Sequence, residues 1–129
     1  MMREEIHSWM ELAESDLEVA QILHNAEKFA GAVYHCQQAL EKALKALYIT
    51  EVGAMFPRTH SLAEIAEPTS FPKDKVDFLR DLTAKYIDTR YPSFPTEKIS
   101  DIYDEEYSRQ VLITTEELVE WIRSQFNGT

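Results

Sequence analysis

The sequence predicts an all-α fold, a single antiparallel up-and-down bundle of four long helices and one short helix that takes in residues 1–129. Two observations lead to this prediction. Apolar residues recur at the three-and-four spacing of a core-facing helix along most of the chain. No segment alternates apolar and polar residues between turn dipeptides, as a half-buried strand does. The composition, 44% hydrophobic and 28% charged residues with 3 Gly and 5 Pro, is that of an ordinary globular domain.

The first two long helices are predicted over residues 4–24 and 27–50. The second is rich in Ala, Leu, Lys, Glu and Gln, which all favour the helical state. Gly53 and Pro57 interrupt the apolar pattern, so a loop is predicted over residues 52–59. Because short loops join the helices, an antiparallel bundle is the simplest packing.

A short helix is predicted to start at Ser61, whose spacing to Glu64 is that of a capping box. In this motif the serine hydroxyl and a glutamate three residues later satisfy exposed amides at the helix start. This helix should end before Pro68. Another long helix is predicted to open at Phe71-Pro72, since proline is tolerated in the first turn.

Tyr91-Pro92 should close that long helix near Thr89 or Arg90, because the residue before a proline is disfavoured in the helical conformation. A loop is predicted over residues 93–101, and a last long helix over residues 104–126. Asn127-Gly128 provides the stop signal of this helix. The sequence shows no internal repeat and no sign of a second domain.

The charge is distributed unevenly along the chain and limits the partners that it can bind. The net charge of −10 disfavours generic binding to nucleic acid, which depends on lysine and arginine displacing counterions from phosphates. Residues 28–90 hold nine basic and eight acidic residues, whereas the flanking segments are acidic. An anion site is therefore expected in the middle third of the chain.

The sequence start and the single cysteine indicate a cellular compartment. The first residues are acidic, unlike the basic start and apolar block of a secretory signal. No run of about 18 consecutive apolar residues is present, so no membrane span is expected. The single cysteine, Cys36, excludes an intrachain disulfide and agrees with a reducing compartment. A cytoplasmic location is therefore predicted.

A row of polar residues runs along the second predicted helix. Glu41 and Lys45 have the favourable orientation of an ion pair one turn apart. The row is either part of a site or a surface feature that fixes helix register. Its members are spaced by four, three and four residues and are Tyr34, Gln38, Glu41 and Lys45, with Gln37 and Lys42 on its flanks.

Asp16 lies at the edge of the apolar face of the first predicted helix. A carboxylate in that position is costly unless it is paired. We therefore predict that Asp16 contacts Lys42 or Lys45 across the interface of the first two helices. Asp16, Gln38 and Glu41 would then belong to one structural polar network.

The residue types that commonly carry catalysis or bind metals are scattered. Cys36 falls on the apolar stripe of its helix and is predicted to be a buried small hydrophobe rather than a nucleophile. No catalytic residue, metal site or certain cofactor is predicted. No metal-binding spacing such as HExxH occurs among the histidines, which are His7, His24, His35 and His60.

Two basic groups stand near predicted helix ends. Arg58 and His60 precede a helix start, where free amides and the helix dipole favour anions. Arg90 lies at a helix end and is followed by Tyr91. Arginine at such a position commonly caps the helix or pairs with an acid.

Four separated segments of the sequence together carry a family resemblance. They are, in order, Trp9, Ala13, Asp16-Leu17 and Ala20, then YHCQQALEKALKAL, then Pro57 with His60-Ser61-Leu62, and finally YIDTRYP. Over nearly the whole chain they resemble the HEPN domain (higher eukaryotes and prokaryotes nucleotide-binding domain). The resemblance implies a small helical bundle that forms a homodimer, pairs with a small nucleotidyltransferase in toxin–antitoxin-like systems and, in some members, binds a nucleotide.

The chain departs from the ribonucleases of that family, which use an arginine and a later histidine with four to six residues between them. Arg3 and His7 have three intervening residues and lie at the wrong end of the chain, and Arg58 and His60 have one. No histidine follows Arg90. Without such a histidine, no obvious side chain is poised to move the proton of a ribose hydroxyl. We therefore expect a non-catalytic HEPN protein.

If the chain binds a nucleotide, basic residues of the middle third would supply positive charge, and tyrosines would stack on a base or hold a phosphate. RNA is a less favoured ligand. Two alternatives remain, a ribonuclease toxin with a degraded or rearranged motif and a plain protein-interaction module without a ligand. The residues predicted for nucleotide binding are Lys42, Lys45, His60, Arg90, Tyr34, Tyr86 and Tyr91.

Overall fold

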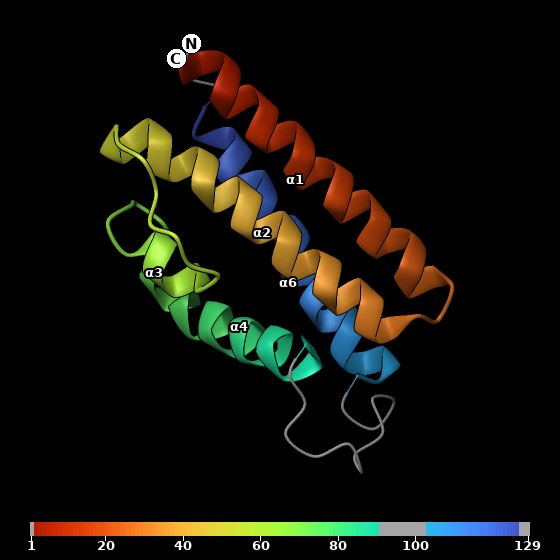
Figure 1. The fold of residues 1–129 in the computed structure, drawn as a ribbon. Coiled ribbons are helices and arrows are strands. Elements are labelled where there is room, and N and C mark those ends of the chain that lie inside the picture. Colours follow the sequence, from red (N-terminus) through yellow and green to blue (C-terminus); the bar gives the residue numbers. More distant parts are fainter. Residues whose placement is uncertain (1, 91–102, 127–129) are drawn as a thin grey trace.

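The computed structural model describes residues 2–90 and 103–126, with side chains over 3–86 and 103–126. It confirms the all-α fold class, and the described residues form no strand (Figure 1). The long helices are α1 (Met2–Asn25), α2 (Phe29–Val52), α4 (Val76–Arg90) and α6 (Glu105–Ser124), while α3 (Leu62–Ala66) is short and η1 (Lys73–Lys75) is a single 3-10 turn.

The long helices alternate in direction, as expected for an up-and-down bundle (Figure 1). Helices α1 and α2 lie side by side and antiparallel, and α6 packs against both. Helix α4 packs against α2 and α3 on the other side of α2. Helix α2 therefore contacts every other α-helix that the structure describes, and residues on different faces of α2 have different neighbours.

The turn between α1 and α2 explains why the second helix starts at Phe29 rather than at residue 27. Glu27 adopts a left-handed conformation with φ 62°, which ends α1. The amide of Lys28 then donates to the carbonyl of Leu23 at 2.8 Å. The two helices approach closely beyond this turn, since a Cβ added at Gly31 would lie 3.2 Å from Leu23 Cδ1.

Sequence signals mark the ends of α2 and α3, although α2 runs to Val52 instead of ending at residue 50. Gly53 caps α2 in the left-handed conformation, with φ 72°, and donates its amide to Ile49. Ser61 caps α3 by accepting a hydrogen bond from the amide of Glu64 at 3.3 Å. The predicted capping box is only half formed, because the amide of Ser61 donates to Thr59 Oγ1 at 3.0 Å instead of to Glu64.

The last two long helices follow the predicted pattern with small shifts at their starts. Phe71-Pro72 leads into η1, so α4 begins at Val76 and ends at Arg90 as predicted. Asp104 caps α6 by accepting from the amide of Tyr107 at 2.8 Å. The loop predicted over residues 93–101 and the stop predicted at 127–128 lie outside the described residues.

Helix α2 supplies the centre of the hydrophobic core. It contributes more residues to the core cluster than any other helix that the structure describes, most of them alanines and leucines, and they pack with residues of α1, α3, α4 and α6. Truncating a fully buried leucine to alanine typically costs about 2–5 kcal/mol. The largest fully buried apolar side chains are Leu40, Leu44, Leu47, Leu62, Ile65, Leu79, Leu82 and Ile122.

Within the described residues, every helix is too short or too polar to span a bilayer.

Candidate functional site

Asp16 of α1 joins two side chains of α2 in what we call the Asp16 cluster, which consists of Asp16, His35 and Lys42. His35 Nδ1 lies 3.0 Å from Asp16 Oδ1, and the ammonium of Lys42 bonds to Oδ2. The Asp16 side chain is 14% exposed. The predicted contact between Asp16 and a lysine of the second helix is therefore present, and Lys42 is the lysine that makes it.

A second carboxylate on α2 has the same kinds of partner, and we call this group, Glu41, Lys45 and His60, the Glu41 cluster. Lys45 Nζ donates to Glu41 Oε2 at 3.0 Å, while His60 Nδ1 lies 3.1 Å from Glu41 Oε1. The Glu41 side chain is only 7% exposed and that of Lys45 16%, whereas that of His60 is 67% exposed. Glu41 is thus a nearly buried carboxylate with two nitrogen partners.

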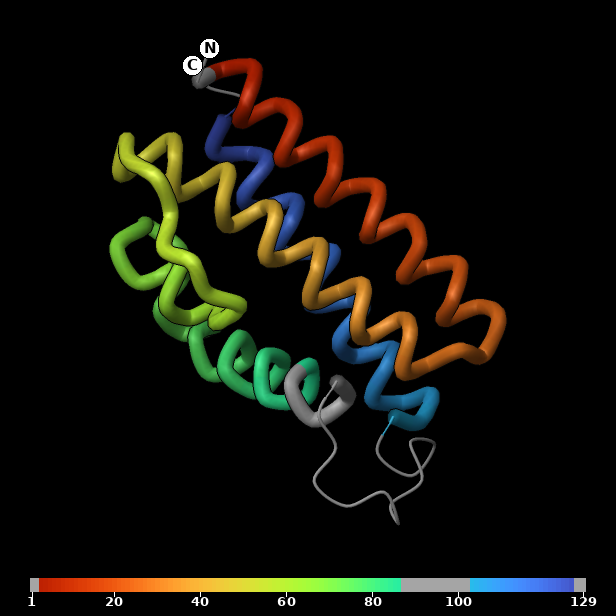
Figure 2. Tube along the Cα trace, viewed as in Figure 1, coloured from red at the N-terminus to blue at the C-terminus, as the bar shows by residue number. Residues whose placement is uncertain are grey.

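The chain segment of residues 53–61 leaves the end of α2 and returns alongside it (Figure 2). His60 thereby meets Glu41, in the middle of the helix, with Nδ1 3.1 Å from Oε1. Gln37 Nε2 donates to the carbonyl of His60 at 3.1 Å. The ammonium of Lys45 lies 4.7 Å from the ring centre of Phe56 and 5.1 Å from that of Trp9. Phe56 and Trp9 also meet edge to face. Three α2 residues at four-residue spacing, Gln37, Glu41 and Lys45, therefore hold this segment.

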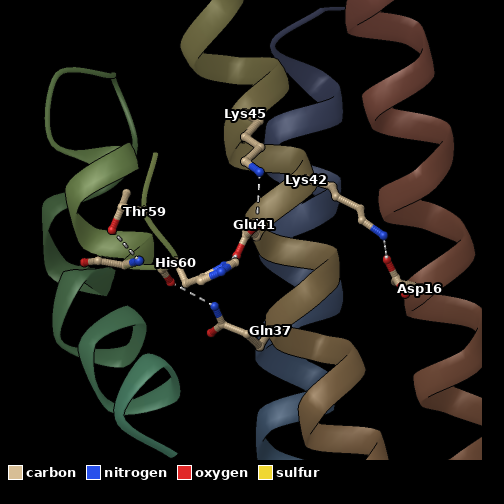
Figure 3. Close-up of polar contacts among 8 residues, drawn as sticks. Asp16, Gln37, Glu41, Lys42, Lys45, Thr59 and His60 are labelled. Atoms are coloured by element: carbon tan, nitrogen blue, oxygen red, sulfur yellow. Dashed lines mark hydrogen bonds and ion pairs between the residues drawn. The ribbon is translucent and has the colours of Figure 1, made fainter. Parts of the chain in front are cut away.

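Figure 3 shows that Glu41 and Gln37 point toward the 53–61 segment, whereas Lys42 points to Asp16 on α1. The prediction of Gln38 as a network member needs correction, because Gln37 fills that role. Gln37 is fully buried, and Gln38 makes no polar contact with the described residues. One residue along a helix turns the side chain by about 100°, which directs Gln38 away from the segment.

Four rings form a continuous line across α2, which we call the ring row, made of His35, Tyr34, Tyr86 and His60. The centres of His35 and Tyr34 are 5.2 Å apart, and Tyr34 stacks on Tyr86 at 5.5 Å with an interplanar angle of 25°. Tyr86 in turn lies 5.8 Å from His60. The fold thus brings together three of the residues predicted for nucleotide binding, Tyr34, Tyr86 and His60, although they are separated in sequence and come from α2, α4 and the segment between α2 and α3.

The remaining predicted site residues divide into two groups. Lys42 and Lys45 belong to the separate clusters described above, each with a carboxylate partner. Arg90 forms the last residue of α4, but its side chain lies outside the described part of the chain. Tyr91 lies outside it altogether.

Cys36 is fully buried between α2 and α6, as predicted for a small hydrophobe. Burial raises the pKa of its thiol from 9.0 to about 12, and the nearby Thr115 side chain opposes this shift only in part. A thiolate is therefore strongly disfavoured at neutral pH, which argues against a nucleophilic role. In the described residues, no group of three or more His, Cys, Asp or Glu side chains is arranged to hold a metal ion.

The contact of Lys45 with Trp9 and Phe56 could not be predicted from the sequence. Periodicity marks Trp9 only as a core-facing residue of the first helix, and Phe56 sits in a segment without periodicity. Two aromatic residues that meet each other and the same lysine in space leave no signal in sequence spacing. The Phe56-Pro57 dipeptide, ahead of His60, is the nearest available hint.

Comparison with solved structures identifies two with the same architecture. The structure of TT1696 from Thermus thermophilus superimposes with a TM-score of 0.81 over 95% of this chain and 98% of that chain, at 25% identity. The structure of ST0689, described as an archaeal HEPN homologue, gives a TM-score of 0.77 over 94% and 97% of the two chains, at 24% identity. The second likeness shows the fold alone.

Among curated proteins, the chain is similar to "Putative toxin MJ1304" of Methanocaldococcus jannaschii, with 48% identity over 46 residues. This match takes in 36% of the chain and spans 30% of the length of that relative. The family model described as the HEPN domain matches residues 6–125. Because that match extends over nearly the whole chain, this protein belongs to the HEPN domain family.

Proposed function

We propose that this chain is a non-catalytic HEPN protein that binds a nucleotide at the ring row and acts with a partner protein in a toxin–antitoxin-like pair. The ring row is the observation that carries the nucleotide part. Aromatic side chains in line provide π-faces on which a base can stack, and such stacking is worth about 1–3 kcal/mol per base. The half-exposed Tyr34 and the exposed His60 are its accessible members.

The chemistry of the described side chains supports a binding rather than a catalytic role. The Cys36 thiol is held in its neutral form by burial. The arginine–histidine spacing of HEPN ribonucleases is missing from the sequence. Both histidines of the ring row have Nδ1 against a carboxylate that also pairs with a lysine, an arrangement that fixes their orientation.

The likeness to a protein named as a toxin supports the partner part of the proposal. In this proposal the chain forms a homodimer and docks on a small nucleotidyltransferase. Copurification of tagged chain with the product of a neighbouring nucleotidyltransferase gene tests the docking, and light scattering measures the mass of the chain alone. A monomer that captures no such protein would contradict this part.

Titration calorimetry with ATP, GTP and their nucleosides tests binding at the ring row. Tyr34→Leu removes the central ring and should weaken binding at least about tenfold, a loss of about 1.4 kcal/mol. Tyr48→Leu is the matched control, because Tyr48 is also a half-buried tyrosine of α2 and lies outside the ring row. Equal losses in both variants, or no binding by the unmodified protein, would remove the nucleotide part.

One observation favours a second candidate, a ribonuclease with a rearranged motif. Asp16 holds Nδ1 of His35 at 3.0 Å, and a carboxylate in that position can orient an imidazole for proton transfer through Nε2. Incubating the purified protein with structured RNA tests this candidate. Cleavage that is lost in His35→Ala or Arg90→Ala would favour the enzyme, and intact RNA would exclude it.

A further inference from the structure

We propose that this site recognises the heterocyclic base of its ligand rather than its phosphates, and that Lys42 and Lys45 position the ring row without contacting the ligand. The proposal rests on nucleotide binding at the ring row. The expected ligands are nucleosides and mononucleotides, and their affinity for this protein should not increase with the number of phosphates.

The first argument against a phosphate contact comes from Lys45, because its charge is already neutralised and enclosed. Its ammonium donates to Glu41 Oε2 at 3.0 Å and lies within 5.1 Å of the ring centres of Trp9 and Phe56. Its side chain is 16% exposed. A phosphate would have to displace a nearly buried carboxylate to reach it, which would leave Glu41 with its charge desolvated and unpaired.

The second argument against a phosphate contact comes from Lys42, because it faces α1 and not the segment that carries His60. It bonds to Asp16 on the α1 side of α2, whereas Glu41 faces the segment that carries His60 (Figure 3). These two carboxylates and the two lysines sum to zero charge. A polyphosphate would therefore meet no net positive charge from these four groups, on a chain whose overall charge is −10.

Stacking does not depend on these charges. Every nucleobase has a π-face, and the attraction between a base and an aromatic ring survives high salt far better than ion pairing with phosphates. Tyr34 and Tyr86 are already nearly parallel, with their planes 25° apart. The rings of the ring row are therefore better placed to hold a ligand than the ammonium groups of Lys42 and Lys45.

Titrations with adenosine, AMP and ATP, and with the matching guanine series, test this inference. The expected dissociation constants lie within about threefold of one another in each series, a spread of about 0.7 kcal/mol. Binding of ATP more than about tenfold tighter than adenosine would overturn base recognition. No binding of any nucleoside or nucleotide would instead refute nucleotide binding itself, so the two failures are distinguishable.

Two arginines define where a phosphate would bind if base recognition is wrong. Arg58 is exposed, lies two residues before His60 and makes no polar contact with the described residues. Arg90 ends α4 one turn after Tyr86. A preference for ATP that disappears in Arg58→Ala or Arg90→Ala would locate the phosphate contact there and overturn the proposal. Retention of equal affinities in both variants supports it.

Lys45→Met separates positioning from phosphate binding. If Lys45 positions the ring row, this variant lowers the affinities for adenosine and ATP by the same factor, and Lys45→Arg restores both affinities. If Lys45 contacts phosphate, only ATP binding weakens, which would overturn the proposal. Lys28→Met is the matched control, because Lys28 is exposed in the turn before α2. Should Lys45→Met fail to fold, Phe56→Leu removes one ring from the same ammonium and is judged by the same ratio.

Discussion

The Asp16 cluster and the Glu41 cluster share one chemistry in two different settings. In each, one carboxylate oxygen meets a lysine ammonium and the other meets Nδ1 of a histidine. The Asp16 cluster joins two long helices. The Glu41 cluster joins a helix to the irregular segment of residues 53–61, and its carboxylate is the more buried, with 7% of the side chain exposed against 14%.

This difference shows what each cluster does for the molecule. Helices α1 and α2 also pack through apolar side chains, so the Asp16 cluster adds to an interface that already exists. The 53–61 segment has no regular hydrogen-bond pattern between Gly53 and the start of α3. Its position therefore depends on the side chains of Gln37, Glu41 and Lys45, and the ring row depends on that position because His60 is its last member.

The largest expected effect is the loss of the Glu41 carboxylate. Glu41→Gln should lower the free energy of unfolding by about 3–5 kcal/mol, because Lys45 would keep its charge in a nearly buried position without a counterion. Urea denaturation measures this change. Asp77→Asn is the control, because Asp77 pairs with Arg80 at the surface and its side chain is 98% exposed. A loss of stability no larger than that of the control would show that Glu41 is not needed to neutralise the charge of Lys45.

Asp16→Asn should have a smaller effect, about 1–3 kcal/mol. The side chains of its partners, Lys42 and His35, are 25% and 29% exposed, so water can replace part of the lost contact. The same urea denaturation series measures it. If Asp16→Asn proved more damaging than Glu41→Gln, the ranking of the two clusters by burial would be wrong.

Phe56→Leu should cost about 1 kcal/mol in global stability, because it removes one face of the contact with Lys45 and the edge contact with Trp9. Its main effect should be local. Amide hydrogen exchange is expected to quicken in residues 53–61 and to stay unchanged in α1. Equal acceleration in both regions would indicate that the segment and the helix pair open together.

The smallest expected effect of Phe56→Leu is on the reactivity of the Cys36 thiol, which lies between α2 and α6. Because burial raises the thiol pKa to about 12, the protein should react very slowly with a thiol reagent at pH 8, with or without Phe56→Leu. Faster labelling in the variant would show that the core had opened too. The raised pKa also predicts a stability contribution that is complete below pH 9.0 and is lost as the pH rises through about 12.

The sequence predicted the helices and one polar contact between them. Helical periodicity placed Asp16 at the edge of an apolar face and Lys42 on the neighbouring helix, and two adjacent antiparallel helices leave few choices of partner. Periodicity placed Gln38 in the polar row and Gln37 on its flank, but it did not show which of the two meets the 53–61 segment, because only the path of that segment decides this. The start of α2 shifted to Phe29 because Glu27 took a left-handed conformation that residues other than glycine rarely adopt.

The amino-acid sequence by itself determined the all-α class, the helix ends at Gly53 and Ser61 and the membership of Asp16 and Lys42 in one interface. These features depend on helix propensity, on capping residues and on the fixed angle between successive side chains of a helix, all of which act over a few residues. Only the tertiary structure decided that Lys45 meets Trp9 and Phe56 and that His60 joins Tyr34 and Tyr86 in one row. Those contacts depend on where an irregular segment returns along α2, and this path is set by the packing of the whole molecule.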